Sequence, residues 1–230
     1  MTKWQTADLK LTADSILRGQ GADPEVIRSR SPKLVEVAEE ALEQAGDILQ
    51  PEVLVVTYPV AKILHDRLDL ENGTSISGPL VSEHLIGAEQ ITAVICTVGP
   101  GIDRYAAEVM QEDIVLGLAI TGVGSAGVEA LANAVCKEIE EEAAESGFQS
   151  TIPLSPGMIN WDVEEGQPLI FDLADPSQIG IDLNTELFML PRYSLSMIIG
   201  IGPDINAGKH ICDYCSMRES CQYQNQQRPG

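Results

Sequence analysis

The sequence predicts an α+β fold. Three apolar runs have the length of buried strands, at residues 53–58, 91–98 and about 195–201. The stretches between them are long, and most carry the apolar spacing of helices. Strands that are few and do not alternate regularly with helices favour α+β over a doubly wound parallel sheet. A chain of 230 residues that is 44% apolar can fill one medium domain and a short appendage.

The first half predicts helices around one strand. Residues 7–18 indicate a short helix, and Ser31-Pro32 opens a longer one, because Ser is a good N-cap and Pro suits the first turn. Gly46 ends that helix, and the strand over 53–58 follows. The segment 72–79 is rich in turn residues, and 81–85 predicts a short helix.

The second half predicts a strand over 91–98 that leads into a glycine-containing turn at 99–101, then helices over 102–111 and 113–145. Gly147 closes the long helix. A loop centred on Pro153 and Pro156 precedes a helix at about 164–174 and the last strand. The chain has no internal repeat and no low-complexity segment.

The charge balance disfavours two classes of partner. The sequence has 14 Lys and Arg against 35 Asp and Glu, a net charge of −21. This field repels nucleic acid and anionic membranes, and no basic patch offsets it. Much of the acid lies on predicted helix faces, most densely from Glu138 to Glu145. These faces are expected to be solvated; a surface for a basic partner is the alternative.

The sequence predicts a cytoplasmic protein. The N-terminus is polar and lacks the apolar region of a signal peptide. Residues 114–136 come closest to a membrane span, but polar residues such as Thr121, Ser125 and Glu129 interrupt them. Five cysteines, an odd number with three clustered near the end, do not indicate a disulfide framework.

Several motifs favour structural interpretations. Gly122, Gly124 and Gly127 match the dinucleotide pattern G-x-G-x-x-G, but an acidic helix stands where the second strand should follow, so close helix packing is expected. The 97–101 turn resembles an anion cradle, yet it has nearby acids and no Lys. His65 and His84 are expected at or near the surface.

The C-terminal segment carries the strongest chemical signal. Cys212 and Cys215 are spaced so that one turn can present both thiolates to a metal, and Cys221 follows after five residues. With His210 as a candidate fourth ligand, zinc fits; an iron–sulfur cluster completed by another group also fits. Unligated, reduced cysteines are the remaining alternative. The cysteine spacing of radical S-adenosylmethionine enzymes is absent.

The order of motifs in the last third resembles a known family. Residues 155–161, 179–183 and 188–194 precede the apolar run and the Cys tail, as in the activation domain of vitamin B12-dependent methionine synthase and the stand-alone proteins similar to it. The resemblance implies a C-shaped domain over residues 1–203, with a twisted, mainly antiparallel sheet flanked by helices. Residues 204–230 would form a metal-binding tail.

The resemblance also implies a function. In methionine synthase this domain binds S-adenosylmethionine and caps the corrinoid, where cob(II)alamin is reduced and then remethylated. We therefore expect a corrinoid (vitamin B12)-associated accessory protein that assists reductive reactivation or methyl transfer in a B12-dependent methyltransferase system. Cobalamin would sit on the partner protein, and S-adenosylmethionine would bind this chain. The alternative is a non-catalytic scaffold protein of the same fold with a zinc-stabilised tail.

The family's ligand-binding residues carry over in part. In the family an arginine before a Pro-Gly-Tyr turn clamps the carboxylate of S-adenosylmethionine. Here Pro153 stands at the arginine and Met158 at the tyrosine, so that clamp is missing, and Arg192 is a candidate displaced cation. No catalytic residue is assigned. The expected ligand-binding residues are Ser155, Gly157, Met158, Trp161, Pro191, Arg192, Tyr193 and Ser194, with Ser196 matching the same proline-then-serine stretch.

Overall fold

The computed structural model describes residues 4–158 and 160–205. Their contacts divide them into two compact units, each built from three separate chain segments. Of the described residues, unit 1 contains 4–53, 96–134 and 177–195, and unit 2 contains 54–95, 135–176 and 196–205. The two units are described separately below.

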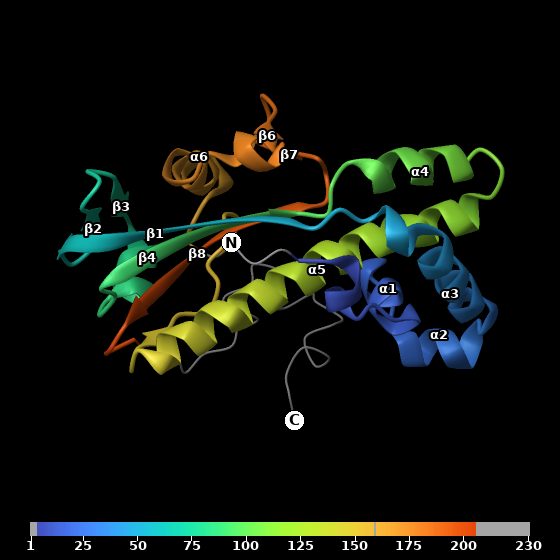
Figure 1. The fold of residues 1–230 in the computed structure, drawn as a ribbon, viewed down its shortest axis with the longest axis horizontal. Coiled ribbons are helices and arrows are strands. Elements are labelled where there is room, and N and C mark those ends of the chain that lie inside the picture. The colour runs from blue at the N-terminus through green and yellow to red at the C-terminus, as the bar shows by residue number, and fades with distance from the viewer. Residues whose placement is uncertain (1–3, 159, 206–230) are drawn as a thin grey trace. The chain divides into compact units, whose positions relative to one another are not determined.

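Unit 1 is mostly helical. It holds the N-terminal helices α1 (Ala13–Gly19), α2 (Pro24–Arg30) and α3 (Lys33–Ala45), which lie together in Figure 1, and also α4 (Gly101–Val109). The first two thirds of α5 (Ile114–Glu145) belong to it as well. Short 3-10 helices span Thr6–Leu9, Gly46–Ile48 and Pro176–Ile179, and β6 (Asp182–Leu183) pairs with β7 (Met189–Leu190) as a small antiparallel hairpin.

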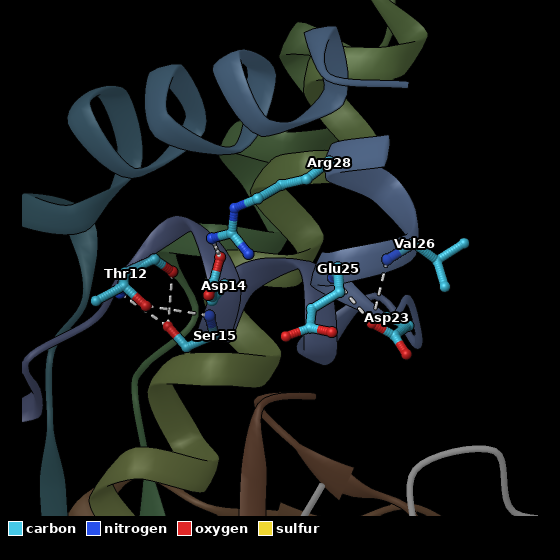
Figure 2. A network of polar contacts seen from close by, with 7 residues as sticks. All are labelled: Thr12, Asp14, Ser15, Asp23, Glu25, Val26 and Arg28. Atoms are coloured by element: carbon cyan, nitrogen blue, oxygen red, sulfur yellow. Dashed lines mark hydrogen bonds and ion pairs between the residues drawn. The ribbon is translucent and has the colours of Figure 1, made fainter. Parts of the chain in front are cut away.

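Helices α1 and α2 begin at side-chain caps (Figure 2). The N-cap of α3 is Pro32, without a side-chain hydrogen bond, so the expected Ser31 cap with Pro32 in the first turn is wrong by one residue. Thr12 accepts a hydrogen bond from the Ser15 amide at 3.2 Å, and the Ser15 hydroxyl accepts one from the Thr12 amide at 2.8 Å. This reciprocal cap starts α1 at residue 13, so the helix expected over 7–18 is divided into the 3-10 helix Thr6–Leu9 and α1. Asp23 caps α2, a helix that the sequence analysis missed, and Arg28 of α2 pairs with Asp14 of α1.

The glycines of α5 serve helix packing. A Cβ on Gly122 would lie 2.9 Å from the carbonyl oxygen of Ile16 in α1, and one on Gly19 would lie 2.8 Å from the Gly122 carbonyl oxygen. A Cβ on Gly124 would lie 2.6 Å from the Tyr193 ring. The G-x-G-x-x-G pattern therefore marks close approach of α1 and Tyr193, as expected, and lies inside a helix.

Unit 2 contains most of the main sheet. Its strands are β1 (Glu52–Ile63), β2 (Arg67–Leu70), β3 (Ser75–Ser77), β4 (Gln90–Thr97), β5 (Gln149–Ser150) and β8 (Ser194–Gly202), in the order β3-β2-β1-β4-β8-β5. The β1–β2, β2–β3 and β5–β8 pairs are antiparallel. A π-helix spans Val81–Leu85, where a short helix was expected. Within this unit, α6 (Val163–Leu173) lies on one side of the sheet and the end of α5 on the other (Figure 1).

Two contacts show how unit 2 covers its sheet. The Tyr58 hydroxyl on β1 donates to the carbonyl oxygen of Leu173 in α6 at 2.7 Å. Its neighbour Thr57 points to the opposite face, because successive strand residues alternate, and contacts Thr92 of β4 at 2.9 Å. From Ile91 to Thr97 every residue of β4 is buried, so this strand forms the centre of the core.

The predicted α+β fold, with an antiparallel sheet flanked by helices, is confirmed. The expected strand over 53–58 is too short, because β1 continues through Pro59 to Ile63 and turns into β2. By length and composition α5 could cross a membrane, but 61% of its most apolar window is buried in protein. Burial of that kind is typical of a core helix.

Candidate functional site

The predicted ligand loop lies beside β8 in unit 2. Leu154 and Ile198 exchange two backbone hydrogen bonds of 2.9 Å, which attach the loop to the strand. Gly157 has φ 91°, a left-handed conformation that favours glycine. Its amide donates to the Trp161 carbonyl oxygen at 2.8 Å, so residues 157–161 close into a compact turn.

Met158 stabilises this turn from within. Its amide donates to the Ser155 carbonyl oxygen at 3.2 Å, and its sulfur accepts from the Ser155 amide at 3.2 Å. Asn160, in the left-handed region at φ 65°, donates from Nδ2 to the Glu83 carboxylate at 3.1 Å. The Met158 thioether, which stands where the family has a tyrosine, thus accepts a hydrogen bond from the backbone of its own loop.

Trp161 joins the loop to α6. The side chain is 3% exposed, and a Cβ on Gly166 would lie 2.7 Å from its Cε2 and 2.9 Å from Pro156 Cγ. Gly166 therefore gives the indole and the proline ring room to lie against the helix backbone. Any displacement of the loop must change the surroundings of Trp161.

The next residue of α6 brings a buried polar group to the same place. Gln167 is 4% exposed, and its Oε1 accepts from the Ser196 hydroxyl of β8 at 3.0 Å. Its Nε2 is buried and has no hydrogen-bond partner among the described residues. A buried amide without a partner costs about 1–3 kcal/mol. We call this group the SPG cluster, after the segment Ser155-Pro156-Gly157; its members are Ser155, Gly157, Met158, Trp161, Gln167 and Ser196.

The sequence analysis did not single out Gln167. A glutamine between Gly166 and Pro168, inside an otherwise apolar helix segment, was the available signal. Its burial depends on the way α6 packs on β8, and the local sequence does not encode that.

The second predicted group lies in unit 1 and forms a turn into β8. The peptide bond between Leu190 and Pro191 is cis, and the Ser194 hydroxyl donates to the Pro191 carbonyl oxygen at 2.7 Å. Arg192 is exposed, with its guanidinium carbon 5.8 Å from the centre of the Tyr193 ring. The structure thus joins the expected site residues in two groups, one in each unit.

Tyr193 is the buried member of the second group. Its carbonyl oxygen accepts from the Thr97 hydroxyl and from the Val98 amide, both at 3.1 Å, and Thr97 also accepts from the Gly99 amide. The 97–99 turn is therefore held by Tyr193. Burial, and to a lesser degree the Asp103 carboxylate, raises the pKa of the Tyr193 hydroxyl, so it stays neutral at pH 7.

The expected metal ligands Cys212, Cys215 and Cys221, with His210, lie outside the described residues. Within residues 4–158 and 160–205 no group of three or more His, Cys, Asp or Glu is placed to hold a metal ion. His84 lies 3.8 Å from the neighbouring Glu83, with a nearly buried side chain. The residue as a whole is half-buried, as expected.

A search of solved structures matches this arrangement of strands and helices. The crystal structure of the MetH reactivation domain bound to AdoHcy aligns with a TM-score of 0.63 and 18% sequence identity, over 89% of this chain and 73% of that chain. The fold is that of the MetH reactivation domain. No family model matches the chain, and no curated protein matches it. The resemblance to the B12-dependent methionine synthase activation domain is confirmed at the level of the fold.

Proposed function

We propose that this protein is an accessory protein of a B12-dependent methyltransferase system, and that it binds S-adenosylmethionine or its demethylated product AdoHcy. It would dock on a corrinoid protein or methyltransferase partner and assist reductive reactivation or methyl transfer. The observation that carries this proposal is the match to a MetH reactivation domain bound to AdoHcy over 89% of the chain.

The SPG cluster supports a ligand site in unit 2. The Ser196 hydroxyl donates to the Gln167 carbonyl oxygen, so the amide nitrogen is directed away from Ser196 and has no acceptor in the part of the chain that the structure describes. A neutral donor held in this way can bind a carbonyl, carboxylate or ring-nitrogen acceptor of a ligand. It would supply part of the polar recognition that is lost with the arginine clamp.

The test is calorimetric titration of the full chain with AdoHcy and with S-adenosylmethionine. A dissociation constant in the micromolar range is expected. Absence of heat up to about 1 mM of either ligand would refute the proposal, since that corresponds to less than about 4 kcal/mol of binding free energy. In a Trp4→Phe variant, the emission of Trp161 should change and saturate with the same constant, because Trp161 anchors the loop.

A paired substitution separates binding from folding. Gln167→Met together with Ser196→Ala removes both polar partners, so neither is left unsatisfied and stability should be unchanged or higher. Affinity for AdoHcy should fall about tenfold, which is the effect of about 1.4 kcal/mol. Gln178→Met makes the same chemical change at an exposed site and should leave affinity unchanged.

For the tail, three thiols and an imidazole form a donor set that suits zinc or an iron–sulfur cluster. We expect stoichiometric metal in protein purified without oxygen. Elemental analysis of the full chain should show that Cys215→Ser abolishes it, whereas Cys96→Ser, a change at a buried cysteine of β4, should retain it. Unchanged metal in Cys215→Ser would reject the metal-binding tail.

A further inference from the structure

The α5-facing side of the sheet in unit 2 contains a small cleft of about 210 Å³. Thr57 of β1 and Gln90 and Thr92 of β4 supply polar groups from the sheet, and Glu142 and Ser146 supply them from the end of α5. Apolar contact comes from residues such as Ile139, Phe148 and Ile201. All of these residues belong to unit 2, and the SPG cluster is not among them.

The cleft has one formal charge. Among the described residues that line it, Glu142 is the one acidic residue, and no Lys, Arg or His is present. Glu142 is exposed, so its carboxylate keeps part of its hydration. An anionic ligand would meet repulsion here without a compensating cation.

The end of α5 adds to this negative potential. A helix C-terminus carries about half a negative charge, and cations in the last turn normally balance it. The last turn of α5 has no basic residue, and Glu138, Glu140, Glu141, Glu142 and Glu145 occupy its final two turns. Lys137 pairs with Glu141 at 3.6 Å. Carboxylates at the C-terminus of a helix destabilise it through repulsion by the helix dipole, so a bound cation would offset part of this repulsion.

The sheet supplies two hydroxyl groups to the lining of the same cleft. The hydroxyls of Thr57 and Thr92 lie 2.9 Å apart, so one donates to the other. The accepting oxygen keeps a second lone pair that can take a hydrogen from a ligand. Thr92 is 1% exposed and Thr57 is exposed, so the pair runs from the buried part of the cleft lining toward solvent.

We propose that this cleft binds a small primary ammonium compound with an apolar body. The ammonium would lie between Glu142 and the threonine pair, and the apolar body would contact Ile139, Phe148 and Ile201. Its volume lies below the range of about 300–1,000 Å³ that holds drug-sized ligands, so the ligand has roughly ten non-hydrogen atoms. This site is independent of the function proposed above.

The probe is 2-phenylethylamine, with 2-phenylethanol as a neutral control of the same size. Titration of the full chain labelled with ¹³C at its methyl groups should shift Ile139 and Ile201 on addition of the amine, with a dissociation constant in the millimolar range. The alcohol should bind more weakly, by up to about fivefold, as expected for loss of one charge pair near the surface. Equal binding of both compounds, or shifts confined to other methyl groups, would overturn the proposal, as would no shift up to about 50 mM amine.

Two matched variants test the role of the carboxylate. Glu142→Gln should weaken amine binding about fivefold and leave alcohol binding unchanged. Glu141→Gln removes the same charge from the adjacent residue, which does not line the cleft, and should change amine affinity less than about twofold. Equal loss in both variants would mean that only the general acidic field attracts the amine, and the site would be rejected.

Discussion

Cys136 lies on α5, and its thiol donates to the Met197 sulfur of β8 at 3.5 Å. Burial, with a smaller contribution from Glu140, raises the pKa of the thiol from 9.0 to about 11. The thiol is therefore protonated at pH 7, and the chemistry proposed for this chain does not use it as a nucleophile.

This shift predicts a loss of stability at high pH. Well below pH 9 the thiol is protonated in both the folded and the unfolded protein. Between pH 9 and about 11 it loses its proton mainly in the unfolded chain. The free energy of unfolding should therefore fall by about 2 kcal/mol between pH 8 and pH 10.5 through this group. Urea denaturation should show this extra fall in the native chain compared with Cys136→Ala. Parallel curves for the two proteins would contradict the prediction.

Gly166 sets the position of Trp161, and its replacement is a second prediction at this scale. In Gly166→Ala the new Cβ meets the indole and the Pro156 ring, so the protein should lose about 1–3 kcal/mol of stability. The Trp161 emission should shift to longer wavelength as the ring is displaced. Gly46→Ala is the control, because its φ is −56° and its nearest neighbour would be Leu42 Cδ1 at 3.5 Å. Equal effects of the two substitutions would contradict this account.

Helix α5 crosses α1 in unit 1 with the backbones in close approach. Gly122→Ala would push against the Ile16 carbonyl oxygen and the Gln20 side chain, and the backbone cannot yield cheaply. A loss of about 2–3 kcal/mol is expected. Gly127→Ala, five residues further along the same helix, meets the flexible Leu49 side chain at 3.2 Å and Val98 Cγ1 at an ordinary contact distance of 3.5 Å, and should cost less than about 1 kcal/mol. Thermal unfolding of both variants measures the two losses of stability. A larger loss in Gly127→Ala than in Gly122→Ala would contradict the close approach of the α5 and α1 backbones.

Elements with a strong local signal were predicted well from the sequence. The apolar runs at 91–98 and 195–201 became β4 and β8, and the long pattern over 113–145 became α5. The β2–β3 hairpin was missed, because Arg67–Leu70 and Ser75–Ser77 are short and mostly polar, and pairing with β1 stabilises them.

Half of the predicted site residues lie together in the SPG cluster. Gln167 was missed, since only tertiary packing buries it.

For the whole molecule, the charge of −21 opposes compaction, because like charges come closer together in the folded chain. Salt screens this repulsion over about 8–10 Å at physiological strength. Urea denaturation in about 500 mM sodium chloride should therefore give a higher free energy of unfolding than in about 20 mM, by on the order of 1 kcal/mol. A decrease in stability with salt would indicate that the described ion pairs outweigh the repulsion.

The interleaving of the two units has a consequence for synthesis of the chain. Each unit draws its residues from three separate segments, and the last of these segments begin only at residues 177 and 196. Neither core can close while the first 150 residues are emerging from the ribosome, because strand β8 is still missing from the sheet. Contacts between such distant segments slow folding. A nascent chain stalled before residue 194 should therefore remain open to protease along its whole length, and release of β8 should protect both units together.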